Sequence, residues 1–275
     1  MRSVFKQNKS YFPMPRLLEP VVKQELLSQL KQGISINKIS KTLGIAKSTI
    51  YPHYEKLNGK KYVQPIFTPE SSELEGEICG IFAGDGSQYF EPKKFSYEVN
   101  VHFGGHKLSY AQYVQELFQI FFNKKFRLRS EKSGALRLRT QSKKIFNYFQ
   151  NYLDYAPAHK HDTVCLKNLA LPEQFRRGFL RGLIDTDGSV LFDKNQRIRI
   201  IYHTTSKILA QQLQALLSHF YIQSTLQIYN HALGYKQLYR VNIRSRSIDT
   251  FLKGVKPFKA QGLVVKPGIT RPWQG

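Results

Sequence analysis

The chain has 275 residues, enough to bury a substantial core in roughly two or three domains. It carries 42 Lys and Arg against 19 Asp and Glu, a formal net charge of +23 and a pI near 9.9, which indicates a polyanionic partner such as nucleic acid. Two cysteines cannot form a disulfide framework, and neither a signal peptide nor a membrane-spanning stretch is apparent. We therefore expect an intracellular protein, cytoplasmic or organellar, and no membrane partner.

Residues 1–17 are basic, aromatic and interrupted by proline, and we interpret them as an arm. Residues 18–60 have helical apolar spacing and are predicted to form a small all-α domain. Its first helix has an apolar face that ends before Gly33 and is made of Val21, Leu26, Leu27 and Leu30. Residues 61–70, with Pro65 and Pro69, are predicted to be a linker.

Within residues 34–51, Ile36, Ile39 and Leu43 mark a short helix, Gly44 supplies a tight turn, and Ser48 is expected to cap a second helix. This spacing resembles the helix-turn-helix of the resolvase and invertase recombinases, whose second helix enters the major groove. The resemblance implies base contacts by Ser48, Thr49 and Tyr51 and phosphate contacts by Lys41 and Lys47. Pro52 departs from the pattern and is expected to distort the second helix. A small helical domain for protein contacts is the alternative.

Two similar stretches, residues 77–87 and 179–189, follow the linker. Each is an apolar helix that ends in Asp-Gly-Ser, with its aspartate at Asp85 or Asp187. A capping box at Ser72 and Glu75 predicts the start of the first helix, and Pro172 can begin the second. A carboxylate at the end of an apolar helix is not needed for folding, so the matching positions indicate that the two aspartates share a site.

Alternating strands and amphipathic helices follow both stretches at a repeat of about 100 residues, the size of an α+β domain. Strands are predicted at 96–103, 125–130 and 135–140 in the first copy, and at 197–202, 225–229 and 238–244 in the second. Helices are predicted at 111–122 and 143–153, then at 207–220 and from 247 to 252. Arginine lies on one face of several strands, which is typical of a sheet open to a polyanion.

The two copies resemble the LAGLIDADG homing endonucleases in their single-chain form. The second motif, residues 180–188, follows the consensus closely, and the first, residues 78–86, keeps Gly80, Asp85 and Gly86 and its apolar positions by type. The resemblance covers roughly residues 70–275. It implies an α+β fold of two pseudo-symmetric αββαββα halves, residues 71–168 and 169–275, that form a β-saddle.

Small residues four apart (Gly80 and Gly84, Gly182 and Thr186) lie on one face of each motif helix and would let the helices pack closely. Paired carboxylates repel one another unless cations lie between them, and hard oxygen ligands favour Mg²⁺, with Mn²⁺ as a substitute. The resemblance implies that Asp85 and Asp187, with the carbonyls of Gly84 and Thr186, hold the metals. Ala83 stands where the motif's first aspartate would be, whereas Asp185 is retained; that position is interpreted as structural.

The resemblance also implies one catalytic lysine per half, and the repeat alignment places these at Lys160 and Lys259. His102 and His203 could order water, although ordinary surface histidines are the simpler interpretation. His159, His161 and Cys165 lack a second ligand cluster, so no zinc site is expected.

DNA contacts are expected from the polar face of both sheets in the major groove, where arginine reads guanine and Asn or Gln reads adenine. The candidates are Arg127, Arg129, Arg137, Arg139, Arg197, Arg199, Arg240, Arg244, Asn100, Gln227 and Asn242.

The sequence thus predicts a monomeric, Mg²⁺-dependent, site-specific double-strand DNA endonuclease (a meganuclease). It would hydrolyse one phosphodiester per strand, leave short 3′ overhangs and serve intron mobility. The alternatives are a maturase that binds intron RNA for splicing and a non-cleaving DNA-binding regulator. Retention of both aspartates argues against a vestigial site.

Overall fold

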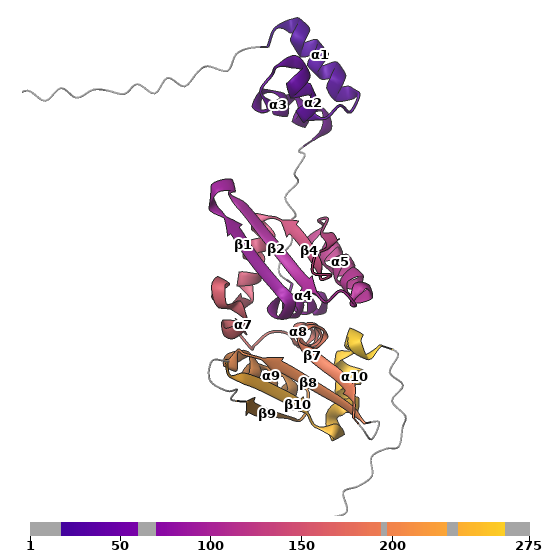
Figure 1. Ribbon diagram of the computed structural model, residues 1–275, viewed down its shortest axis with the longest axis vertical. Helices are drawn as coiled ribbons and strands as arrows, with labels where there is room; N and C mark the ends of the chain where they lie inside the picture. The colour runs from indigo at the N-terminus through magenta and orange to yellow at the C-terminus, as the bar shows by residue number, and fades with distance from the viewer. Residues whose placement is uncertain (1–17, 60–69, 194–196, 230–235, 262–275) are drawn as a thin grey trace, which may run out of the picture. The chain divides into compact units, whose positions relative to one another are not determined.

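The computed structural model describes residues 18–59, 70–193, 197–229 and 236–261 (Figure 1). The chain divides into two compact units, Met1–Gln64 and Pro65–Gly275. Across the described ranges, no helix has both the length and the apolar character needed to cross a bilayer. The predicted arm at residues 1–17 and most of the predicted linker lie outside the described residues.

The described part of the first unit has three helices, α1 (Pro20–Lys31), α2 (Ile36–Leu43) and α3 (Lys47–Asn58). Ser35 caps α2 by accepting a hydrogen bond from the Lys38 amide (3.3 Å), and Gly44 ends it in the left-handed region at φ 65°. That conformation turns the chain sharply between α2 and α3 and costs glycine little. The buried core of this unit is Leu26, Leu30, Ile36, Ile39 and Ile50.

Three details of the first unit differ from expectation. Val21 is 76% exposed, so it does not belong to the apolar face of α1. Ser48 lies inside α3 and does not cap it, because the helix begins at Lys47 after Ala46, which makes no side-chain cap bond. Pro52 does not end α3, which continues to Asn58, although proline has no N–H to donate to the carbonyl four residues earlier.

The second unit is organised around α4 (Glu73–Asp85) and α8 (Glu173–Thr186), which lie side by side at its centre (Figure 1). Glycine lets their backbones touch. A methyl group at Gly80 would lie 3.0 Å from the Leu183 amide nitrogen, and one at Gly182 would lie 2.6 Å from that of Ile81. Gly76 and Gly178 extend the same contact toward the N-terminal ends of both helices. The predicted close packing of the motif helices is present and is longer than the sequence indicated.

The start of α4 follows the predicted cap in part. Ser72 Oγ accepts a hydrogen bond from the Glu75 amide (3.2 Å), as expected for a capping residue. The reciprocal bond of a capping box is absent from the hydrogen bonds described here, because Glu75 accepts instead from the amide of Glu70 (2.9 Å). The buried Glu75 carboxylate also accepts from the Tyr148 hydroxyl, so both of its oxygens are satisfied.

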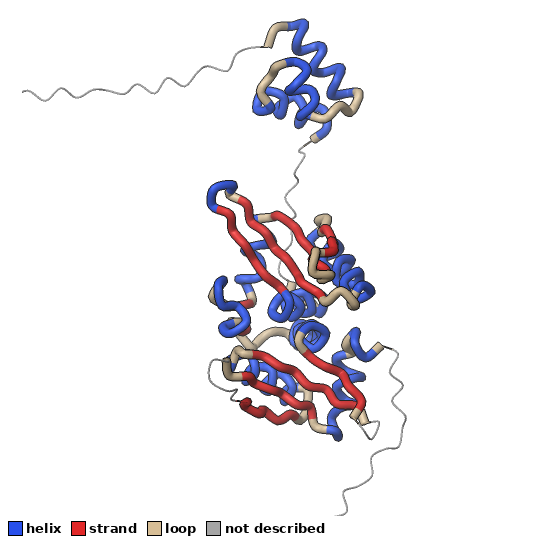
Figure 2. The backbone as a smooth tube through the Cα atoms, in the orientation of Figure 1, coloured by secondary structure: helices blue, strands red, loops and turns tan. Residues whose placement is uncertain are grey.

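Each half carries a four-stranded antiparallel sheet (Figure 2). The first sheet has the order β1-β2-β4-β3 and is built from β1 (Gly86–Glu91), β2 (Ser96–Phe103), β3 (Arg127–Ser130) and β4 (Leu136–Gln141). The second has the order β7-β8-β10-β9, with β7 (Gly188–Phe192), β8 (Ile198–Thr204), β9 (Ser224–Tyr229) and β10 (Leu238–Ile243). The same order in both sheets bears out the predicted duplication and the α+β fold class.

Helices cover one face of each sheet. In the first half these are α5 (Leu108–Phe122) and α6 (Lys143–Tyr148), and in the second α9 (Lys207–His219) and α10 (Ile248–Val255). Short elements complete the unit: η1 (Pro92–Lys94), η2 (Phe149–Asn151), β5 (Leu153–Asp154), η3 (Pro157–His159), α7 (Lys160–Thr163), β6 (Cys165–Leu166), η4 (Ser245–Ser247) and η5 (Phe258–Ala260). One continuous core runs through both halves.

Several predicted boundaries were wrong. The strands β1 and β7 were implied by the αββαββα topology but were not located in the sequence, because neither alternates apolar with polar residues. The helix predicted for residues 143–153 ends at Tyr148 and gives way to the 3-10 turn η2 and the strand β5. Arg197 precedes β8 and Arg244 follows β10, so neither lies within a strand as predicted.

Candidate active site

The two motif aspartates meet where α4 and α8 end. Asp85 is the last residue of α4, and Asp187 follows the last residue of α8. A methyl group at Gly84 would overlap the Thr186 side chain and lie 3.2 Å from Asp187 Oδ2. The carboxylate of the second half therefore lies against the helix end of the first, which brings Asp85 and Asp187 into one site.

The protein environment disfavours the charged form of both carboxylates. The pKa of Asp85 is raised to about 6, mainly because burial removes water from the carboxylate and secondly because Asp187 repels its negative charge. Desolvation by the surrounding side chains also raises the pKa of Asp187, although the residue as a whole is exposed. Two carboxylates held together at this cost indicate a binding site for a cation.

Lys160 and Lys259 occupy equivalent places beside these aspartates. The Lys160 amine donates to three carbonyl oxygens at the end of α4, those of Phe82 (3.0 Å), Ala83 (2.6 Å) and Gly84 (2.8 Å). The Lys259 amine donates to the carbonyls of Ile184 (3.1 Å), Thr186 (2.9 Å) and Gly188 at the end of α8. A cation at a helix C-terminus is favoured by the helix dipole.

Burial makes both lysines less basic than usual. Desolvation lowers the pKa of Lys160 and of Lys259 to about 8 in each case, while the negative charges of the aspartates act in the opposite direction. An amine with a pKa near 8 carries its proton at neutral pH and can release it more readily than a surface lysine. Such a group can stabilise a developing anion or take part in proton transfer.

Lys107 is a third cation near the site and was not predicted. Its charge lowers the pKa of Asp85 and of Asp187, and also that of Lys259. It precedes α5 directly, and the equivalent position before α9 is Ser206. The repeat alignment could not find it, because the two halves differ here.

Each lysine loop is braced by the opposite half of the unit. Thr205 Oγ1 donates to the His161 carbonyl (2.9 Å), and Ser206 Oγ donates to the Val164 carbonyl (2.8 Å), so the second half holds the loop after Lys160. The ring of Phe258, next to Lys259, packs against Tyr110 (centroids 5.2 Å apart) in the first half. The site is therefore shared by both halves and depends on their interface.

The donor set fits a hard divalent cation. Among the described residues, no three or more His, Cys, Asp or Glu are grouped in a way that could hold a metal ion. The site instead offers two carboxylates, with the carbonyls of Gly84 and Thr186 beside them. Each of these carbonyls accepts one lysine hydrogen bond and retains a second lone pair. An ion such as Mg²⁺ keeps several waters and completes its shell from phosphate, so few protein ligands suffice.

The two histidines lie on the polar face of the sheets. His102 Nε2 is 3.0 Å from Ser87 Oγ, so this exposed histidine already has a partner. Partial burial and the neighbouring charge of Arg240 lower the pKa of His203, which favours its neutral form.

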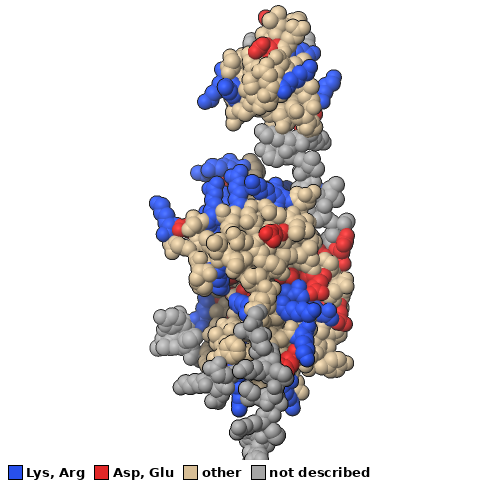
Figure 3. Space-filling view, turned by 90° about the vertical axis from the view of Figure 1, so that its right-hand side faces the viewer, with Lys and Arg blue, Asp and Glu red and all other residues tan. Residues whose placement is uncertain are grey.

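Figure 3 shows Lys and Arg gathered at the upper left of the second unit and a further group right of centre, beside several acidic residues. In the first sheet, Arg127 and Arg129 are exposed on β3, directly opposite Arg139 and Arg137 on β4. Two of these four arginines are partnered: Arg139 with Glu98 and Arg137 with Glu131 (3.0 Å). Asn100 is only 5% exposed, and its Oδ1 is buried without a hydrogen-bond partner.

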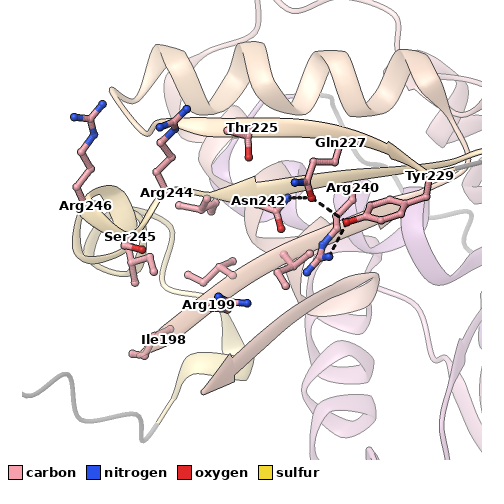
Figure 4. Close-up of a pocket in the computed structure, with 14 residues that line it drawn as sticks. Ile198, Arg199, Thr225, Gln227, Tyr229, Arg240, Asn242, Arg244, Ser245 and Arg246 are labelled. Atoms are coloured by element: carbon pink, nitrogen blue, oxygen red, sulfur yellow. Dashed lines mark hydrogen bonds between the residues drawn. The ribbon is translucent and has the colours of Figure 1, made fainter. Parts of the chain in front are cut away.

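The second sheet has a groove of about 780 Å³ on the same face (Figure 4). The Arg240 guanidinium donates to the Tyr229 hydroxyl (3.0 Å), and Gln227 Oε1 accepts from that hydroxyl (3.0 Å) and from Asn242 Nδ2 (3.1 Å). Arg199 and Arg244 also line it, whereas Arg197 is exposed outside it. Apart from Arg197, the predicted sheet residues of this half therefore converge on one polar, basic groove.

The predicted base-contacting residues of the first unit do not share one environment. Ser48 is exposed, and Thr49 is partly buried. Tyr51 packs partly against the small core, and its ring centroid lies 6.3 Å from that of Tyr54. The exposed face of α3 that carries Ser48 also carries Pro52 and Glu55, and Lys41 and Lys47 are both exposed.

Comparison with known proteins agrees with this geometry. A sequence profile described as LAGLIDADG-like domain matches residues 174–256, the stretch from α8 to α10. This part of the chain is a LAGLIDADG-like domain. The fold of both halves is that of the two-motif LAGLIDADG endonucleases, as predicted. No curated protein sequence matches the chain.

The similar solved structures include the homing endonuclease I-DmoI in several forms. Its mesophilic variants superpose with a TM-score of 0.52 at 21% identity, over 67% of this chain and 91% of theirs. I-DmoI in complex with DNA and Mn gives a TM-score of 0.51 at 21% identity, over 68% and 97%. A single-substitution variant of I-DmoI, in complex with its target DNA and in the presence of 2 mM Mn, gives 0.52 at 21% identity, over 70% and 98%. At this identity the similarity is one of fold.

Proposed function

We propose that the chain is a site-specific DNA endonuclease that requires a divalent metal ion and hydrolyses one phosphodiester in each strand of its target. The observation that carries the proposal is the convergence of Asp85, Asp187, Lys160 and Lys259 at the junction of two basic sheets. The LAGLIDADG-like domain and the fold shared with I-DmoI, which was solved with DNA and Mn, support it.

The metal ligands in this proposal are the carboxylates of Asp85 and Asp187, with the carbonyls of Gly84 and Thr186. A bound divalent ion, Mg²⁺ or its substitute Mn²⁺, supplies Lewis-acid activation of water and of the leaving oxygen. The lysine amines contact the same helix ends, so they are positioned to stabilise negative charge on the phosphate during attack. Each half is proposed to cut one strand, in keeping with the pseudo-twofold arrangement, and the expected products have short 3′ overhangs.

The basic face of both sheets is proposed to lie along the major groove. Arginines on β3, β4, β8 and β10 provide the charge that attracts the phosphate backbone, and the side chains in the groove of Figure 4 are candidates for base contacts. Intron mobility is the expected biological role, and the chain is expected to act as a monomer because it carries both halves of the site.

The first unit is proposed to bind DNA next to the cleavage site through α2 and α3. A double variant with glutamate in place of both exposed lysines, Lys41 and Lys47, would shorten the DNA segment protected in a footprint, because the two introduced carboxylates would repel phosphate. Cleavage at the central position would continue. An unchanged footprint would assign the unit to protein contacts.

The experiment that tests the function is cleavage of a randomised double-stranded DNA library with Mg²⁺. Wild type is compared with Asp85→Asn and Asp187→Asn, which remove one charge each and keep the side-chain shape. Specific double-strand cuts that both substitutions abolish would support the proposal and reveal the target. Specific binding of DNA without cleavage in the wild type would identify a regulator, and preferential binding of structured intron RNA would identify a maturase.

A further inference from the structure

Asp185 is a buried carboxylate that the proposed chemistry does not use. It lies inside α8 with no exposed surface, two residues before Asp187. A buried carboxylate is costly unless its oxygens accept hydrogen bonds, so its partners reveal what it does. Both partners lie more than 70 residues further along the chain.

Each oxygen of the Asp185 carboxylate accepts one backbone hydrogen bond from η5. Oδ2 accepts from the Phe258 amide (2.8 Å) and Oδ1 from the Lys259 amide (2.9 Å). Bonds from N–H groups to an ionised acceptor are roughly twice as strong as neutral ones. The turn that carries Lys259 is therefore fastened to the motif helix at the lysine's own backbone.

The side chain of Lys259 returns to the same segment of α8. Its amine donates to the carbonyls of Ile184 (3.1 Å) and Thr186 (2.9 Å), the residues on either side of Asp185. Lys259 is thus held at both ends: the backbone amide by the Asp185 side chain, and the amine by the flanking carbonyls. This double attachment fixes the lysine relative to the site with little freedom in between.

The first half lacks this attachment. Ala83 occupies the position that corresponds to Asp185, and its methyl group cannot accept a hydrogen bond. The amine of Lys160 still donates to the equivalent carbonyls, those of Phe82 (3.0 Å) and Gly84 (2.8 Å). Its loop is instead braced by Thr205 and Ser206 of the other half. The two lysines therefore share a position but differ in support.

We propose that Asp185 is a positioning residue for Lys259, and that the halves are functionally unequal because only the second has this anchor. The expected effect of Asp185 on cleavage rests on the proposed endonuclease function. The attachment of Lys259 to Asp185 does not depend on that function. Asp185→Asn would break the anchor, because an amide offers one acceptor where the carboxylate offers two.

The first test measures lysine reactivity in the metal-free, DNA-free protein by trace acetylation with acetic anhydride and mass spectrometry. In Asp185→Asn the labelling rate of Lys259 would rise by about tenfold, as expected for the loss of hydrogen bonds to a charged acceptor. Lys160, in the same molecule, would keep its wild-type rate. Asp249→Asn, which removes an exposed charge from α10, serves as the matched control and would change neither rate.

An unchanged labelling rate of Lys259 in Asp185→Asn would overturn the proposal. An equal rise in the labelling rates of Lys259 and Lys160 would also overturn it, because it would indicate a general loosening of the fold. If Asp185→Asn does not fold, Asp185→Ser, which retains one small acceptor, takes its place with the same expectations. These readouts decide the anchor even if the wild type cuts no DNA, so the inference and the proposed function can fail separately.

The second test follows each DNA strand separately. Asp185→Asn would slow the same strand as Lys259→Met, and the double variant would cut no more slowly than Lys259→Met alone, because Asp185 acts through that lysine. Lys160→Met would show a different strand bias. Equal slowing of both strands by Asp185→Asn, or a further loss in the double variant, would contradict a positioning role.

Discussion

Asp187 lies against Gly84 across the interface of α4 and α8. A methyl group added at Gly84 would lie 3.2 Å from Asp187 Oδ2 and would overlap the Thr186 side chain. The geometry of the site is therefore set by how closely α4 and α8 approach. Glycines at that interface are structural requirements of the active site, even though none of them has a functional group.

Gly80→Ala is predicted to be strongly destabilising. Its methyl group would lie 3.0 Å from the Leu183 amide nitrogen and closer still to the Phe179 carbonyl, both rigid backbone atoms of α8. We expect a loss of about 3 kcal/mol in the free energy of unfolding, as for an overpacked core, measured by urea denaturation.

The matched control is Gly254→Ala in α10, where nothing lies within 4 Å of the added methyl group. Alanine is favoured over glycine in helices, so this variant should be as stable as the wild type or up to about 1 kcal/mol more stable. Equal stability of Gly80→Ala and wild type would mean that the helices do not pack as closely as described.

The paired carboxylates predict a pH-dependent penalty in the metal-free protein. The folded pKa of Asp85 is about 6, above its unfolded value of 3.8, so its contribution to stability is present below pH 3.8 and is lost as the pH rises through 6. Asp85→Asn should therefore raise the unfolding free energy by about 2 kcal/mol near pH 8 and have little effect near pH 3.5.

Thermal unfolding of both proteins across this pH range, with EDTA present, measures the difference. Asp249→Asn, which alters an exposed carboxylate, should show no such trend. If Asp85→Asn changed the stability equally at both ends of this pH range, the charge of the Asp85 carboxylate would not destabilise the folded protein.

The sequence located the centre of the site because the two motifs and their spacing are local patterns. Asp85 and Asp187 follow from the motifs, and Lys160 and Lys259 follow from a nearly constant offset between the halves. The structure places both amines on equivalent helix-end carbonyls. Which group carries out which step remains part of the proposal.

Features that depend on tertiary contact could not be predicted in the same way. Lys107 is one lysine in a very basic chain, and only the fold brings its charge to the aspartates. The bonds that the η5 amides donate to Asp185 join residues more than 70 apart, with no local signal. The strands β1 and β7 pair along their whole length with β2 and β8.

Arg181→Met is predicted to destabilise the interface between the halves. Arg181 donates to the buried carboxylate of Glu77 (2.8 Å), to Glu73 and to the Val255 carbonyl (2.7 Å). Methionine would fill the space but leave Glu77 without its counter-charge, at a cost of about 3–5 kcal/mol in the free energy of unfolding.

Arg177→Met on the same helix is the control for that prediction. Arg177 pairs with the exposed Glu173 at i,i+4, a contact of less than about 1 kcal/mol. Urea denaturation of both variants would compare a buried and a surface ion pair in one helix. Similar losses in the two variants would contradict the importance assigned to the Glu77 pair.

The groove of the second sheet predicts a base preference for Gln227 that differs from the usual one. A guanidinium can only donate, so Tyr229 accepts from Arg240 and directs its own proton to Gln227 Oε1. That oxygen also accepts from Asn242 Nδ2, so the amide of Gln227 presents mainly its N–H donors to DNA. Adenine requires both a donor and an acceptor from glutamine, whereas guanine and thymine offer acceptors in the major groove.

Wild type is therefore expected to select guanine or thymine at the base pair that Gln227 contacts. This base pair is identified as the one at which Gln227→Ala loses its base preference. Tyr229→Phe removes one donor to Oε1 and should raise the relative affinity for adenine there by about tenfold, within the energy of a good bidentate contact. Sequencing of sites selected from a randomised library, with each variant in parallel, provides the measurement. Two results would contradict the prediction: a wild-type preference for adenine at this position, or a base preference that Tyr229→Phe leaves unchanged. Either would show that DNA binding reorganises these side chains and that Arg240 does not orient them.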